Sequence, residues 1–151
     1  MEEVEAIACR EAVRFALQLG LTDVVFEGDS ESITMAINSG NPCFSSYGHI
    51  LDDVKALVLN FVSVSFLHVK RQGNAVADKL AKVAKNIPCP HVWSDDIPND
   101  VHQLVIHDCI HRYIKVLSSF SKKKKKVRIK FLSLKKKKKI PLSIVTIQTL
   151  K

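Results

Sequence analysis

Three carboxylates and a histidine are spaced so that they could support phosphodiester chemistry. Glu5 lies early in an expected helix, Asp29 directly follows an expected strand, and Asp78 lies early in a later helix. In open parallel sheets, ligands bind outside the carboxyl ends of the strands, so we expect these acids to meet there. Grouped carboxylates suit Mg²⁺, and two such ions would activate water and stabilise the leaving oxygen. His68, ten residues before Asp78, could shuttle a proton.

Each of these residues also has an ordinary structural interpretation. Acids such as Glu5 and Asp78 are favoured near helix N-termini by the helix dipole. Asp29 could simply cap the helix that follows it, and His68 could be a hydrogen-bonded histidine at the end of a strand. Residue type and spacing alone leave both interpretations open.

The hydropathy pattern predicts the elements that would position these residues. Helices are expected where apolar residues recur every three or four positions, and strands where short runs are rich in β-branched and aromatic residues. The expected helices cover residues 2–19, 30–38, 50–60 and 75–85, and the expected strands cover residues 23–27 and 62–69. This order predicts an α/β fold with parallel strands. Two strands make a poor sheet, so we expect strands that should pair with them to be missing.

Basic and acidic residues are distributed unevenly along the chain. Residues 118–151 contain 13 of the 23 Lys and Arg residues and no acid, whereas residues 1–117 contain the other 10 and all 15 acids. We therefore expect a folded domain at residues 1–87 and a proline-containing wrapping loop with a short helix at residues 88–117. The basic tail at residues 118–151 is expected to be disordered or poorly packed.

Several classes of protein do not fit the composition. The acidic N-terminus is not followed by the apolar region of a signal peptide, and no apolar stretch is long enough to span a bilayer. The four cysteines are far apart and form no C-x-x-C pair, so we expect free thiols. These features predict an intracellular protein that is neither secreted nor membrane-bound.

Three stretches of the sequence carry a more specific pattern. They are Val4-Glu5-Ala6-Ile7-Ala8, Phe26-Glu27-Gly28-Asp29-Ser30, and residues 66–81, in which His68 precedes Arg71, Asn74 and Ala77-Asp78-Lys79-Leu80-Ala81. On these residues the chain resembles the ribonuclease H type-1 domain, specifically its plant reverse-transcriptase-like branch. The resemblance covers about residues 1–111.

The resemblance implies a fold, an activity and a set of site residues. The fold is a five-stranded mixed sheet with flanking helices, and the activity is hydrolysis of the RNA strand of an RNA–DNA hybrid with two Mg²⁺ ions. The catalytic and metal-binding acids correspond to Glu5, Asp29 and Asp78, and the family's mobile histidine corresponds to His68. The expected partner is therefore a hybrid duplex, recognised by its shape and its 2′-hydroxyl groups.

The chain also departs from the family pattern. Three family strands, the first of which carries a further catalytic Asp, would precede Met1. We therefore expect a ribonuclease H-like three-layer α/β fold that lacks these strands and has an exposed sheet edge. Because the absent Asp bridges both metal ions, hydrolysis should be impaired, and whether this chain is an enzyme stays open. Another chain could supply the missing strands.

The remaining nucleic-acid-binding candidates are polar or basic. They are Arg71, Asn74, Lys122, Lys123, Lys124, Lys125 and Lys126. The lysine run at residues 122–126, like the second run at 135–139, could bind polyanions by counterion release or act as a nuclear localisation signal. Such runs also arise as solvated tails or from translated A-rich sequence. Two alternatives thus stand beside the nuclease-like function: a non-catalytic nucleic-acid-binding module that acts through the tail, and a non-functional fragment.

Overall fold

The structure, a computed structural model, describes residues 2–84, 99–107, 127–132 and 144–149. The helices are α1 (Glu2–Gln18), α2 (Glu31–Asn38), α3 (Gly48–Val58), the 3₁₀-helix η1 (Arg71–Asn74) and α4 (Ala75–Ala84). The strands are β1 (Asp23–Gly28), β2 (Ser63–His68), β3 (Val127–Leu132) and β4 (Ile144–Thr149). Residues 99–107 form a further helix. The predicted α/β class is confirmed, and the predicted helices and first two strands match the observed ones closely.

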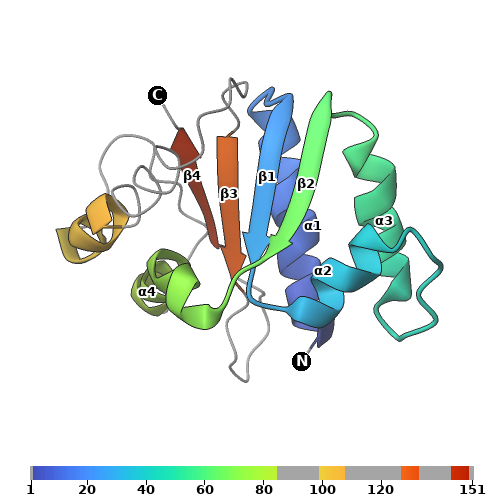
Figure 1. The fold of residues 1–151 in the computed structure, drawn as a ribbon, viewed down its shortest axis with the longest axis horizontal. Helices are drawn as coiled ribbons and strands as arrows, with labels where there is room; N and C mark the ends of the chain where they lie inside the picture. The colour runs from blue at the N-terminus through green and yellow to red at the C-terminus, as the bar shows by residue number, and fades with distance from the viewer. Residues whose placement is uncertain (1, 85–98, 108–126, 133–143, 150–151) are drawn as a thin grey trace, which may run out of the picture.

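The four strands form one mixed sheet in the order β2-β1-β3-β4 (Figure 1). Strand β1 pairs in parallel with β2 on one side and with β3 on the other, whereas β3 and β4 are antiparallel. The parallel pairing of β1 and β2 was predicted from the helical segments between them, because a parallel connection requires a crossover. The arrangement is consistent with a partial ribonuclease H-like fold.

Strand β1 shows that both faces of the sheet are covered. Successive side chains of a strand point to opposite faces, yet all residues from Val24 to Gly28 are buried. One cluster of buried residues combines β1 with α1, α2 and α3, and Figure 1 shows α1 behind the sheet. A second, smaller cluster joins α4 to Val101 of the helix at residues 99–107. The molecule therefore has the three layers predicted from the resemblance.

The main core is built around Phe26. Its ring stacks on Phe66 of β2, with centroids 5.0 Å apart, and meets Phe61 edge-on at 6.0 Å. The buried face of α1 is made mostly of small residues, which let the helix approach the sheet closely. These residues are Ala6, Ala8, Cys9, Ala12, Val13 and Ala16.

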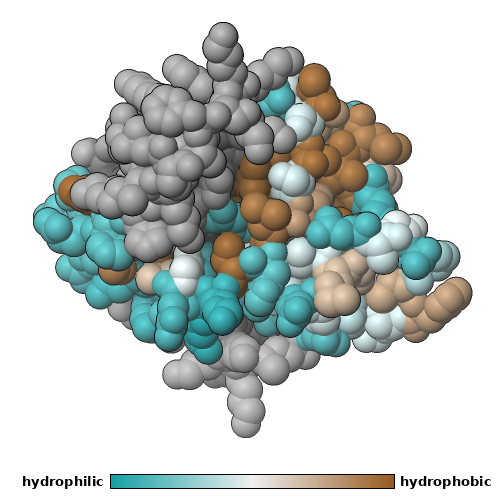
Figure 2. All heavy atoms as spheres, viewed as in Figure 1, coloured by the Kyte–Doolittle hydropathy of each residue, from teal (hydrophilic) through white to brown (hydrophobic). Residues whose placement is uncertain are grey.

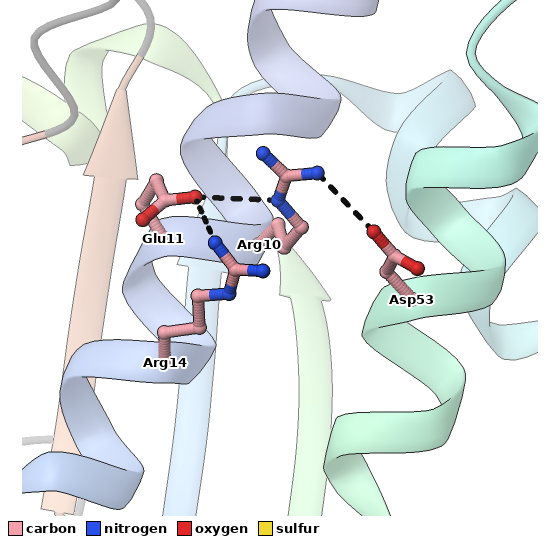
Figure 3. A network of polar contacts seen from close by, with 4 residues as sticks. All are labelled: Arg10, Glu11, Arg14 and Asp53. Carbon is pink, nitrogen blue, oxygen red and sulfur yellow. Dashed lines mark hydrogen bonds and ion pairs between the residues drawn. The ribbon is translucent and has the colours of Figure 1, made fainter.

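An ion-pair network joins α1 to α3 on the outer surface (Figure 3). The Arg10 guanidinium contacts the Asp53 carboxylate at 3.2 Å across the two helices. On α1 itself, Arg10 and Arg14 each contact Glu11 at 3.2 Å. The side chains of Asp53 and Arg14 are about half exposed, so this network orients the helices but contributes little to stability.

Two segments of the basic tail belong to the sheet. We expected the tail to be disordered or poorly packed, and residues 127–132 and 144–149 form β3 and β4, while residues 118–126, 133–143, 150 and 151 lie outside the described part. The missing strands were expected to leave an exposed sheet edge, and β3 occupies the position beside β1. The sheet thus includes residues on both sides of the boundary predicted at residue 117.

Two further expectations can be compared with the described residues. Cys9 and Cys43 are free thiols, while Cys89 and Cys109 lie outside this part of the chain. Within the described ranges, every helix is too short or too polar to cross a bilayer.

Candidate functional site

The carboxyl ends of β1 and β2 bring Asp29 and His68 to one end of the sheet. Gly28 and His68 are partners in the strand register, and the backbone N–H of Val69 donates to the carbonyl oxygen of Gly28 at 2.9 Å. Asp29 directly follows Gly28 and is half-buried, whereas His68 is exposed. The placement agrees with the prediction that both residues lie at the strand ends, where ligands of parallel sheets bind.

The helix after β1 is capped by Ser30 rather than by Asp29. The Ser30 hydroxyl oxygen accepts a hydrogen bond from the backbone N–H of Ile33 at 3.5 Å, and the Thr34 hydroxyl donates to the Ser30 carbonyl at 2.8 Å. The alternative in which Asp29 serves as this cap is therefore wrong. Within the part of the chain that the structure describes, the Asp29 carboxylate is left available for another role.

Glu5 lies near the beginning of α1. Figure 1 shows that α1 begins at the end of the sheet where β1 and β2 finish. Glu5 is half-buried and shares the first turn with Glu2 and Glu3. The acids of this turn interact favourably with the helix dipole, so the structural interpretation of Glu5 remains beside the catalytic one.

Asp78 is held between two basic side chains. Its carboxylate contacts Lys82 Nζ at 2.6 Å and Arg71 Nη2 at 3.5 Å. The hydrogen bond from Lys82 is the main cause that lowers the pKa of Asp78, with Arg71 adding to it against the opposing effect of burial. Sequence reasoning missed Lys82, although its position four residues after Asp78 on one helix was a usable signal.

The acids do not form a metal-binding group in the described part of the chain. Across residues 2–84, 99–107, 127–132 and 144–149, no three His, Cys, Asp or Glu side chains are grouped so that they could hold a metal ion. The Asp78 carboxylate is already engaged by Lys82 and Arg71. These donors do not fit a two-magnesium site as they stand, and the metal role of Glu5, Asp29 and Asp78 stays a prediction.

Basic residues gather on η1 and α4, next to the end of β2. Residues 68–84 contain Lys70, Arg71, Lys79 and Lys82 against one acid, Asp78. The Arg71 side chain is 67% exposed and that of Lys82 is 61% exposed. Figure 2 shows hydrophilic residues around α4 and the lower ends of the strands, and hydrophobic ones over the opposite end. Lys79 is paired with Asp100 at 3.7 Å, and Arg71 and Lys82 share Asp78. The surface formed by η1 and α4 therefore keeps a net positive charge that can attract an anionic ligand.

The other predicted nucleic-acid-binding residues, Asn74 and the lysine run, cannot be assigned to this surface. Asn74 is fully buried where η1 meets α4, so its side chain belongs to the interior. The lysine run at residues 122–126 lies outside the described residues.

Acidification is expected to weaken the fold through Asp78. Its pKa is lower in the folded state than in the unfolded chain, so its contribution is complete above the unfolded pKa and is lost as pH falls through the folded pKa. Asp78→Asn should remove about 0.5–1 kcal/mol at pH 7 and flatten this dependence. Urea unfolding at pH 7 and at pH 3 measures both effects. Asp52→Asn, at an exposed acid 3.9 Å from Lys55, is the matched control, and an equal effect of both variants would contradict the prediction.

Comparison with known proteins places these residues in a family. A family model described as reverse transcriptase-like matches residues 1–84, a segment that includes Glu5, Asp29, His68 and Asp78. No curated protein and no solved structure matches the chain. The matched residues span more than half of the sequence and run from α1 to the end of α4. The chain therefore belongs to the reverse-transcriptase-like family and contains a ribonuclease H-like domain.

Proposed function

We propose that this chain is a nucleic-acid-binding domain whose ligand is an RNA–DNA hybrid and whose capacity for hydrolysis is impaired. It would represent the plant branch of the family. The observation that carries the proposal is the exposed basic surface of η1 and α4, adjacent to Asp29 and His68, within the segment that matches the family.

The basic surface supports binding of a phosphate backbone. Arg71 can place its guanidinium against phosphate oxygens. Because Arg71 and Lys82 share one acid, Asp78, their combined charge stays positive, and Lys70 next to Arg71 adds to it. Contacts of this kind position a duplex without reading its sequence, and each one releases condensed counterions. Such binding suits a family whose expected ligand is recognised by shape.

The arrangement of the acids supports impaired hydrolysis. When bound, Mg²⁺ would supply charge stabilisation and an activated water to a ribonuclease H-like site. Glu5, Asp29 and Asp78 are the residues that would hold it, but in the described chain Asp78 instead neutralises Lys82 and Arg71. His68 is exposed and can approach a bound strand. Its expected role in proton transfer therefore needs less rearrangement than metal binding by the acids does.

A hybrid-binding experiment tests both parts of the proposal. The full chain is titrated into a labelled RNA–DNA hybrid with and without Mg²⁺, and binding and strand cleavage are followed in the same samples. We expect salt-sensitive binding and no cleavage. Arg71→Ala should weaken binding and lower the slope of log affinity against log salt by about 1. Arg14→Ala removes a half-exposed arginine from α1 and is the matched control.

Three outcomes would contradict the proposal in different ways. Failure of the folded chain to bind the hybrid would remove the function altogether. Equal binding by the Arg71→Ala and Arg14→Ala variants would exclude the η1–α4 surface and favour the lysine runs of the tail. Mg²⁺-dependent cleavage that Asp29→Asn abolishes would show that hydrolysis is intact.

A further inference from the structure

Strand β3 reaches β1 from a distant part of the sequence. Gly28 ends β1 and Val127 begins β3, so the two strands are 99 residues apart. Their parallel register pairs Val24 with Val127, Phe26 with Ile129, and Glu27 with Lys130. Without β3, this side of β1 would present unpaired backbone donors and acceptors, which is the type of edge that accepts an added strand.

Ile129 is the anchor of this contact. It is fully buried and belongs to the same cluster as Phe26 and the small residues of α1. Helix α1 contacts β3 as well as β1, so the Ile129 side chain lies in a site formed by the helix and the sheet together. Strand pairing provides main-chain hydrogen bonds, and a buried alternate side chain adds specificity.

We propose that this side of β1 is a strand-acceptor site and that its ligand is residues 127–132, supplied by the same chain. The ligand alternates apolar residues at 127, 129 and 131 with basic residues at 128 and 130. That alternation is the pattern of a strand with one apolar face. The fold is thus completed by its own C-terminal segment, and the site accepts an extended peptide of this chemistry.

Hydrogen exchange in the full chain tests whether β3 protects β1. Ile129→Asn removes the apolar anchor without changing charge, and Leu59→Asn, at a residue that is 84% exposed, is the matched control. We expect the amides of Asp23–Gly28 to exchange at least tenfold faster in Ile129→Asn and at an unchanged rate in Leu59→Asn. Equal exchange in both variants would overturn the proposal.

A peptide added in trans tests whether the site accepts a ligand. A labelled peptide of residues 125–134 should bind the Ile129→Asn chain and slow β1 exchange again, whereas the peptide carrying Ile129→Asn should not. The wild-type chain should bind little of either, because its own strand is tethered to the site and competes with the added peptide. Equal binding of the two peptides would show a merely electrostatic contact and overturn the proposal.

A disulfide cross-link provides a second test that does not depend on whether the Ile129→Asn variant folds. Val24 and Val127 are register partners, and paired strands bring Cα atoms within the range of a disulfide. The full-length Val24→Cys/Val127→Cys variant should form that bond within one chain, and Val24→Cys/Arg128→Cys, which is shifted by one residue from the observed register, should not. The proposal that the strand comes from the same chain would be overturned by cross-links in both variants, in neither variant, or only between two copies.

Discussion

Replacing Phe26 with alanine is expected to remove about 3–5 kcal/mol from the free energy of unfolding. Phe26 is fully buried in β1, stacked 5.0 Å from Phe66, and in edge contact with Phe61. Removal of its ring leaves a cavity between the sheet and α1 that the small side chains of the helix cannot fill. The loss is large compared with the total stability of about 5–15 kcal/mol that is usual for a domain.

Phe44→Ala provides the matched control for this prediction. Phe44 is 97% exposed, so loss of its ring creates no cavity and should change the free energy of unfolding by less than about 0.5 kcal/mol. Equilibrium unfolding in guanidinium chloride, followed by circular dichroism, measures both variants under the same conditions. Similar unfolding midpoints for the two variants would contradict the placement of Phe26 at the centre of the core.

Gly48→Ala is expected to destabilise the protein by about 1–3 kcal/mol, as overpacked sites commonly do. Gly48 begins α3, and a Cβ atom added there would overlap the carbonyl oxygen of Cys43 and lie 3.0 Å from its carbonyl carbon. Because the overlapping atoms belong to the backbone, the whole turn from Cys43 to Gly48 must shift. That turn contains the hydrogen bond from the Gly48 N–H to the Ser45 carbonyl, at 2.9 Å.

A second glycine allows a direct comparison. A Cβ atom added at Gly73 would lie 3.9 Å from the Val69 Cβ, which is an ordinary contact distance. Gly73→Ala should therefore be neutral or slightly stabilising, since it also restricts the unfolded chain. Thermal unfolding of both variants, with hydrogen exchange along α3, distinguishes a local from a global effect. A stable Gly48→Ala variant with unchanged protection of α3 would show that the turn is more adaptable than its geometry indicates.

Local patterns in the sequence were sufficient for most of the described elements. The helical periodicity of α1, α3 and α4 and the β-branched run of β1 are properties of neighbouring residues, so they can be recognised without knowledge of the fold. Asp29 and His68 could also be placed at the carboxyl ends of β1 and β2, because the same local patterns predicted where these two strands end. The end of α1 was predicted one residue too late. The expected helix at residues 2–19 included Leu19, yet α1 ends at Gln18 and Leu19 is 47% exposed.

Long-range pairing could not be predicted in the same way. The alternation of apolar and basic residues from Val127 to Leu132 was present in the sequence, but the lysine runs beside it suggested a solvated tail. Only the tertiary structure shows that this segment completes the sheet beside β1 and buries Ile129. The local pattern can indicate a strand, but it carries no information on which distant strand becomes its partner.

In the candidate site, too, the sequence identified the residues, whereas only the tertiary structure shows their contacts. Residue types and spacing identified Glu5, Asp29 and Asp78 as acids that could work together. The contacts that determine their present roles come from the folded chain, in which Ser30 caps α2 and Asp78 pairs with Lys82 and Arg71. A sequence specifies which charges are available, whereas the distances between charges decide which of them neutralise one another, and these distances exist only after folding.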